Sequence, residues 1–167
     1  MSGSRALALM GFMACGKSTV GSLVAARTGA PYRDLDDMIE ERCGTTIAEL
    51  FRREGEPAFR DLEASLLPEA LTPGSIVALG GGTPLRDDSW AVIRERSVSV
   101  WLDVPLDELL ARAGPGADRP LLGGRGAAEL GALLETRLPR YRQADHRVDG
   151  TRPPEVVAEE VSRLWRG

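Results

Sequence analysis

A glycine-bounded loop near the N-terminus constrains the fold of this chain more than any other segment. Residues 11–18, GFMACGKS, match the pattern G-x-x-x-x-G-K-[ST]. They follow an apolar run at 5–10, which we expect to be a buried strand, and precede 17–28, whose apolar spacing predicts a helix ending at Gly29. Because N–H groups of such a loop point inward and the helix N-terminus adds positive partial charge, the pattern predicts a phosphate-binding site.

The residue types in this loop fit a bound nucleotide. Lys17 offers a mobile point charge to the β- and γ-phosphates, and the Ser18 hydroxyl can ligate Mg²⁺. Lys17 is the single lysine among 21 basic residues, and a compact ammonium is not replaced by a planar guanidinium. A chance loop-to-helix turn is the alternative. Cys15 is open to two interpretations, a small tolerated residue or a thiol whose pKa is lowered at the helix N-terminus.

Strands and helices are expected to alternate along the remaining sequence. Further strands are expected at 31–35, 75–79, 98–102 and 146–148, and helices at 37–42, from a capping box at 46–49, from about 57, and at 106–112, 130–141 and 157–165. This alternation predicts a three-layer α/β fold of the P-loop kinase type, with a five-stranded parallel sheet and helices on both faces, in a single domain spanning 1–167. Such sheets bind ligands beyond the carboxyl ends of their strands.

Composition narrows the classes of protein that this chain can belong to. The formal net charge is −4, and no basic stripe with interleaved aromatic residues is present, so a nucleic-acid-binding role is excluded. Two cysteines without a CxxC motif fit a reduced, cytoplasmic setting, and one histidine cannot build a His-rich metal site. The apolar start is too short for a membrane span or a signal peptide. We expect a monomer with no membrane partner.

An acidic pair follows the expected second strand. Asp34 and Asp36 are two residues apart, so on a strand their carboxylates would share one face and point into one cleft. One could hold Mg²⁺ through water, and the other could orient or deprotonate an attacking hydroxyl. The alternative is a polar strand end at which Asp36 or Asp37 caps the next helix.

Three other segments carry candidate functional residues. Arg60 and Glu63 are spaced for one helix face, where a solvated salt bridge is the usual interpretation. The triple glycine 80–82 follows a buried strand and suggests close approach of a ligand to the backbone, with a plain loop as the alternative. The glycine-rich residues 113–125 predict a mobile lid whose Arg119, with Arg112 before it, could reach a transferring phosphoryl group.

Together these motifs resemble the shikimate kinases, a family of P-loop enzymes related to the nucleoside monophosphate kinases. The matching stretches are GFMACGKSTVG (11–21), DLDD (34–37), GTTIAELFRREGEPAFRDLE (44–63), LGGG (79–82), RPLL (119–122) and RLPRYR (137–142). They cover most of the chain in the order that the family has them. The first stretch occurs in many nucleotide-binding proteins, whereas the combination of the others is much more specific.

The resemblance implies Mg-ATP-dependent phosphorylation of the 3-hydroxyl of shikimate, a step towards chorismate and the aromatic amino acids. It places a substrate-binding segment at about 34–63 and the lid at about 113–125. It implies that Asp36 binds the ring hydroxyls and acts as base, that Lys17 and Arg119 assist the transfer, and that Ser18 and Asp34 hold Mg²⁺. The substrate would be bound by Asp36, Arg60, Gly80, Gly81, Gly82 and Arg142, with Glu63 supporting Arg60. The nucleotide would be bound by Ala14, Cys15, Gly16, Lys17, Ser18, Thr19, Arg112, Arg119 and Arg152.

Physical chemistry agrees with this resemblance. A carboxylate ligand calls for guanidinium partners that bind it bidentately, and a triol calls for a carboxylate acceptor such as Asp36. A kinase of the same group acting on another polyol acid, such as gluconate, is the nearest alternative, and the paired arginines and triple glycine argue against it. A regulatory nucleotide-binding module without turnover would be expected to lack Lys17, Ser18, Asp36 or Arg119, all of which are present.

Overall fold

A five-stranded parallel sheet forms the centre of the molecule, in the order β2-β3-β1-β4-β5. The computed structural model describes residues 4–114 and 125–167. The strands are β1 (Ala6–Met10), β2 (Tyr32–Asp34), β3 (Ile76–Ala78), β4 (Ser97–Asp103) and β5 (His146–Asp149). All four neighbouring pairs are parallel, so the predicted sheet is confirmed.

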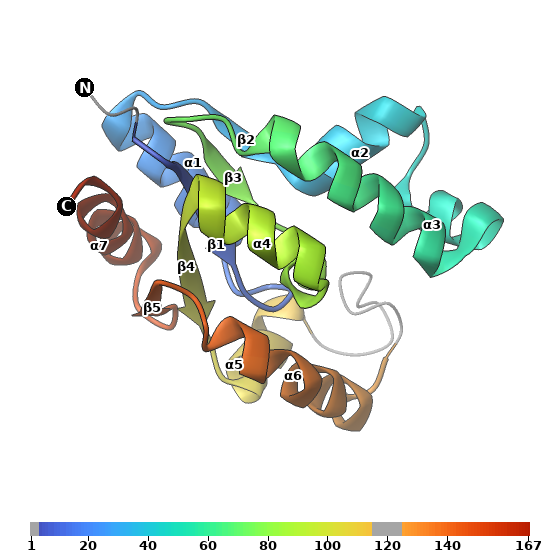
Figure 1. The fold of residues 1–167 in the computed structure, drawn as a ribbon. Helices are drawn as coiled ribbons and strands as arrows, with labels where there is room; N and C mark the ends of the chain where they lie inside the picture. The colour runs from blue at the N-terminus through green and yellow to red at the C-terminus, as the bar shows by residue number, and fades with distance from the viewer. Residues whose placement is uncertain (1–3, 115–124) are drawn as a thin grey trace.

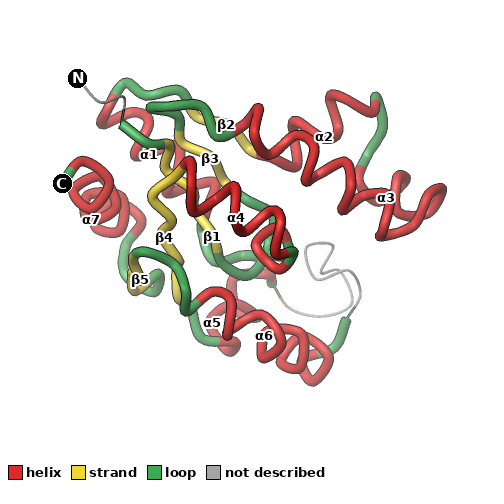
Figure 2. The backbone as a smooth tube through the Cα atoms, viewed as in Figure 1, coloured by secondary structure: helices red, strands yellow, loops and turns green. Residues whose placement is uncertain are grey.

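Helices cover both faces of this sheet. They are α1 (Lys17–Thr28), α2 (Leu35–Cys43), α3 (Ile47–Ala70), α4 (Asp87–Arg96), α5 (Leu106–Ala113), α6 (Ala127–Tyr141) and α7 (Pro154–Arg166), with a 3-10 turn, η1, at Thr83–Leu85. The ribbon shows α1 and α7, which pack on each other, on one side of the sheet, and α4 on the other (Figure 1). The tube view shows the strands enclosed between helices, as the three-layer prediction requires (Figure 2). Within the described residues, no helix is long and apolar enough to span a membrane.

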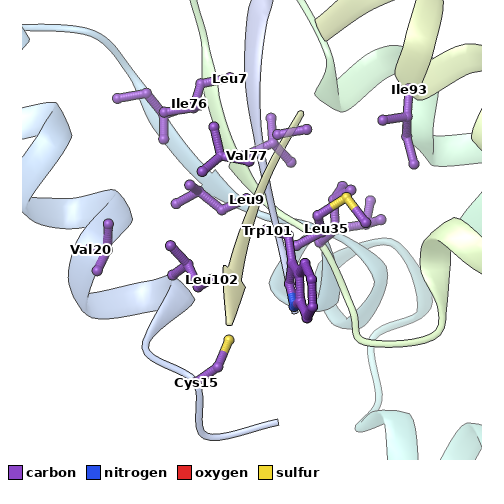
Figure 3. Close-up of a cluster of buried hydrophobic side chains, with 14 of the residues drawn as sticks. Leu7, Leu9, Cys15, Val20, Leu35, Ile76, Val77, Ile93, Trp101 and Leu102 are labelled. Carbon is purple, nitrogen blue, oxygen red and sulfur yellow. The ribbon is translucent and has the colours of Figure 1, made fainter. Parts of the chain in front are cut away.

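The core lies on both faces of the central strand. Every residue of β1 is buried, as expected for a parallel strand covered on both faces. Side chains from β1, β3 and β4 meet those of α1, α2 and α4 in one cluster, which includes Leu9, Val77, Leu102, Val20 and Ile93 (Figure 3). This packing fixes the strands whose carboxyl ends carry the loops described below.

The structure differs from the sequence predictions at two elements. Helix α4 was not expected, because only Trp90, Ile93 and the half-buried Val92 contribute apolar side chains to the core and no long apolar period marks it. Its sequence signal is the acidic first turn and the basic last turn, which suit the helix dipole. The strand expected at 31–35 ends at Asp34, so Asp36 lies in the first turn of α2, and the expectation of two carboxylates on one strand face was wrong.

Candidate active site

Two cavities open at the carboxyl edge of the sheet and share the loop after β1 as a wall. The larger, about 750 Å³, lies over the N-terminus of α1 and is lined by loop residues from Ala14, by Arg112 and by residues 150–154 after β5. The smaller, about 220 Å³, is lined by Met13, Asp36, Ile47, Phe51, Phe59, Arg60, Glu63, Gly80, Gly81, Gly82 and Arg137. Because Met13 faces one cavity and Ala14 the other, molecules bound in the two cavities would meet at this loop.

The loop has the backbone geometry of an anion site. Gly16 adopts φ +103° immediately before α1, a conformation that favours glycine. The first N–H groups of α1 have no acceptor of their own within the helix, and they lie at the positive end of its dipole. Lys17 Nζ donates to the carbonyl oxygens of Gly11 (2.7 Å) and Phe12 (3.0 Å), which keeps the ammonium at the loop. Ser18 and Thr19 line the same cavity.

Cys15 has its side chain in the core, while its backbone borders the larger cavity, which is called the nucleotide cavity below. The residue is 2% exposed and belongs to the hydrophobic cluster (Figure 3). A Cβ atom added at Gly11 would lie 2.7 Å from the Cys15 sulfur. The Cys15 side chain therefore packs here because Gly11 has no side chain. The burial favours the interpretation of Cys15 as a small packed residue.

The predicted nucleotide-binding arginines divide into two groups. Arg112 joins two walls of the larger cavity, because its guanidinium donates to the carbonyl oxygens of Cys15 (3.1 Å) and Gly150 (2.7 Å). Arg152 lines the same cavity and pairs with Glu160 of α7. The third residue, Arg119, and most of the expected lid at 113–125 lie outside the described residues.

Ser18 and Asp34 form the candidate Mg²⁺ site. The Ser18 hydroxyl lies 3.5 Å from Oδ2 of Asp34, beside the phosphate loop. In the described parts of the chain no group of three or more His, Cys, Asp or Glu side chains forms a closed metal cage. Mg²⁺ at nucleotide sites needs none, since it takes one or two protein oxygens, keeps several waters and binds the substrate phosphates. The two oxygen donors therefore fit this ion.

The triple glycine passes directly against the charged groups of the smaller cavity. A Cβ atom added at Gly80 would lie 3.3 Å from Oδ1 of Asp36, one at Gly81 would lie 2.6 Å from Nη1 of Arg137, and one at Gly82 would lie 2.7 Å from Cζ of Arg60. Any side chain here would displace these groups. The glycines are thus required by close approach, and they arrange a carboxylate at one end and two guanidinium groups at the other.

Arg60 and Glu63 form a partly buried ion pair rather than the expected solvated one. Arg60 Nη1 donates to Oε1 of Glu63 at 2.9 Å, and the Glu63 side chain is only 2% exposed. The second carboxylate oxygen of Glu63 accepts from the Thr83 hydroxyl at 2.9 Å. Burying a carboxylate is costly unless its oxygens are paired, and both are paired here. The contacts hold Arg60 at the cavity wall. No motif or spacing pointed to Thr83.

Asp34 and Asp36 have different roles at the start of α2. Oδ1 of Asp34 accepts from the backbone N–H of Asp36 (2.9 Å), so Asp34 is the helix cap, and Asp36 and Asp37, the alternatives weighed above, are not. Asp36 lies in the smaller cavity. Burial, with the carboxylates of Asp34 and Glu63, raises the pKa of Asp36 to about 6, against the opposing effect of Lys17 and Arg60. A carboxylate with this pKa is suited to accept a proton near neutral pH.

Arg142, which the resemblance assigns to the substrate, is not among the residues that line the smaller cavity. It is exposed and follows the last residue of α6. Arg137, from the same RLPRYR stretch, lines the cavity instead, is 8% exposed, and has its guanidinium 5.3 Å from the centre of the Phe12 ring. Helical spacing was the signal that could have found it, since Arg137 lies four residues before the buried Tyr141.

A nucleotide in the larger cavity would present its terminal phosphate, across the loop, to a small anion held in the other. That geometry, on a parallel sheet with this loop after its first strand, defines a P-loop kinase of a small molecule. The family model for shikimate kinase matches residues 13–165. A shikimate kinase of Nitrobacter winogradskyi is 46% identical over 171 residues, which cover 98% of this chain and 80% of the relative. The chain belongs to the shikimate kinase family.

Solved structures agree with this membership. Shikimate kinase from Acinetobacter baumannii, in complex with shikimate, matches with a TM-score of 0.87 at 30% identity, over 96% of this chain and 92% of that one. A gluconokinase from Sinorhizobium meliloti matches with a TM-score of 0.62 at 17% identity, over 99% of this chain and 94% of that one. The second likeness concerns the fold alone. The fold is therefore common to kinases of different acceptors, and the cavity residues must distinguish them.

Replacing Asp36 by asparagine should stabilise the free protein in a pH-dependent way. The folded-state pKa of about 6 lies above the ordinary 3.8, so the folded protein binds this proton more tightly and loses stability as the pH rises from about 4 to about 6. Asparagine does not ionise. Asp36→Asn should thus be more stable than wild type by roughly 1–3 kcal/mol above pH 7, and the gain should vanish below pH 4.

Urea unfolding of both proteins between pH 4 and pH 8 measures this difference. Equal free energies of unfolding at pH 7.5 would show that Asp36 ionises without cost. A stability difference that grows as the pH falls would reverse the sign of the argument.

Proposed function

We propose that this chain transfers the γ-phosphoryl group of ATP to the 3-hydroxyl of shikimate, giving ADP and shikimate 3-phosphate on the route to chorismate. The observation that carries this proposal is the order of groups along the glycines of the smaller cavity. Asp36 lies at Gly80, Arg137 at Gly81 and Arg60 at Gly82. The cavity has a volume of about 220 Å³. Shikimate would offer its ring carboxylate to the two arginines and its three hydroxyls to the end of the cavity at which Asp36 lies.

The carboxylate is bound by Arg60 and Arg137 in this proposal. Guanidinium groups bind carboxylates bidentately, and both side chains are fixed before the substrate arrives, Arg60 by Glu63 and Arg137 by burial. Arg137 thereby takes the role that the resemblance gave to Arg142. The backbone of Gly80–Gly82 lies against the ring, and residues 34–63 supply the other walls of the site.

Asp36 orients the 3-hydroxyl and accepts its proton as the phosphoryl group is transferred. Its pKa of about 6 leaves it ionised at neutral pH and still able to bind a proton. Lys17, at the loop between the cavities, balances the charge on the β- and γ-phosphates. Ser18 and Asp34 would hold Mg²⁺, which supplies charge neutralisation at the phosphates. Arg112 and Arg152 line the nucleotide cavity, and Arg119 stays a predicted contact of the phosphates. That the enzyme is a monomer and lies in the cytoplasm also stays a prediction.

Acceptor selectivity tests the function. ADP release, measured with Mg-ATP and shikimate, gluconate or AMP in parallel, should be fast with shikimate and at background with the other two. Gluconate has a carboxylate and hydroxyls but no ring to lie against the glycine backbone. Release with gluconate and not with shikimate would overturn the assignment. Release with none of the three would favour a regulatory nucleotide-binding module.

The two arginines of the RLPRYR stretch provide a matched pair of variants. Arg137→Lys should raise the KM for shikimate about tenfold or more, because an ammonium cannot make the bidentate contact, while the KM for ATP stays within about twofold. Arg142→Lys, on the exposed end of the same helix, should change neither constant. Steady-state kinetics of both variants, with unfolding midpoints as the control for folding, measures this. The reverse pattern would restore Arg142 to the substrate site.

A further inference from the structure

Tyr141 contacts the backbone of the triple glycine from behind the cavity. It is the last residue of α6, is completely buried, and its ring packs on Trp101 with 6.0 Å between ring centres. Its phenol donates to the carbonyl oxygen of Gly81 at 2.6 Å. The geometry is that of a strong hydrogen bond, and it joins segments 60 residues apart in the chain.

This hydrogen bond restrains the middle carbonyl of the triple glycine, while the carbonyls of Gly80 and Gly82 accept from the N–H groups of Thr83 and Leu85, each at 3.1 Å. Glycine has more conformational freedom than any other residue, and three in succession have no side chains to hold them. In a planar trans peptide the carbonyl of Gly81 and the N–H of Gly82 point in opposite directions. Fixing the carbonyl towards buried Tyr141 therefore turns the Gly82 N–H away from it. Gly82 borders the cavity and lies against the Arg60 guanidinium.

One turn of α6 serves both parts of the carboxylate end of the cavity. Arg137 and Tyr141 are four residues apart, on the same helix face. A Cβ atom at Gly81 would lie 2.6 Å from Nη1 of Arg137 and 3.4 Å from the Tyr141 oxygen, so both side chains converge on this glycine. Movement of the helix end would shift the guanidinium and the glycine backbone together.

We propose that Tyr141 is a positioning residue for the acceptor, which holds the Gly81–Gly82 peptide in the orientation that binds the substrate carboxylate beside Arg60 and Arg137. The proposal rests on the function proposed above and adds to it a residue that does not touch the substrate. Burial raises the pKa of the Tyr141 phenol, so the group stays protonated and acts as a permanent donor.

Tyr141→Phe tests this role, because it keeps the ring and removes one hydroxyl. We expect the KM for shikimate to rise about three- to tenfold, the size of effect that loss of one buried hydrogen bond produces. The KM for ATP and kcat should stay within about twofold of wild type, since the nucleotide cavity and Asp36 are not touched. Thr136→Val is the matched control. It removes a hydroxyl that donates to a backbone carbonyl (Leu133, 2.6 Å) on the exposed side of the same helix, and should change none of these constants.

A merely structural tyrosine would lower the unfolding midpoint without separating the two KM values. An unchanged KM for shikimate, or an equal rise of both KM values, overturns the proposal. NMR of the wild-type protein supplies a second test that needs no variant: the Tyr141 hydroxyl proton should exchange slowly and show a nuclear Overhauser effect to the Gly81 α-protons. Absence of that contact also overturns it. Wild-type turnover with shikimate, recorded in the same assays, separates these outcomes from failure of the proposed function.

Discussion

The parallel direction of three adjacent strands determines where the chemistry of this chain takes place. β2, β3 and β1 are neighbours in the sheet, and each is followed by a segment of the site: the acidic residues from Asp34, the glycines 80–82 and the phosphate loop. Because the strands run the same way, these segments arrive at one edge, although the phosphate loop (11–18) and the glycines (80–82) lie far apart in the sequence. The nucleotide and acceptor cavities share a wall for this reason.

Glu63 is a buried charge in the wall of the smaller cavity, where the acceptor is proposed to bind. A buried carboxylate needs partners, and it finds them in Arg60 and the hydroxyl of Thr83. It also contributes to the raised pKa of Asp36, after burial and Asp34. One residue that points away from solvent thus fixes a cation for the substrate and helps to adjust the proposed base. Such coupling is expected where the site is built from facing charges in a small volume.

The sequence predicted the elements whose signal is local. The phosphate loop, the helix after it and the buried strands follow from residue order alone, and all are confirmed. It could not predict the depth of Glu63 or the contact from Thr83, because these depend on α3 and η1 packing together. Asp36 was placed on the wrong element. Asp34 is the last residue of β2 and caps α2, so the strand ends there and Asp36 belongs to the helix. For α6, the resemblance led to Arg142, whereas Arg137, four residues before the buried Tyr141, is the residue that lines the cavity.

The central claim is that the phosphoryl group passes directly from ATP in one cavity to the ring hydroxyl held by Asp36 in the other. Phosphorus NMR of the wild-type protein with Mg-ATP and shikimate tests it most directly. The account predicts a phosphomonoester resonance coupled to the proton on carbon 3 of the ring, formed in the same amount as ADP. Inorganic phosphate as the main product, or coupling to another ring proton, would contradict it.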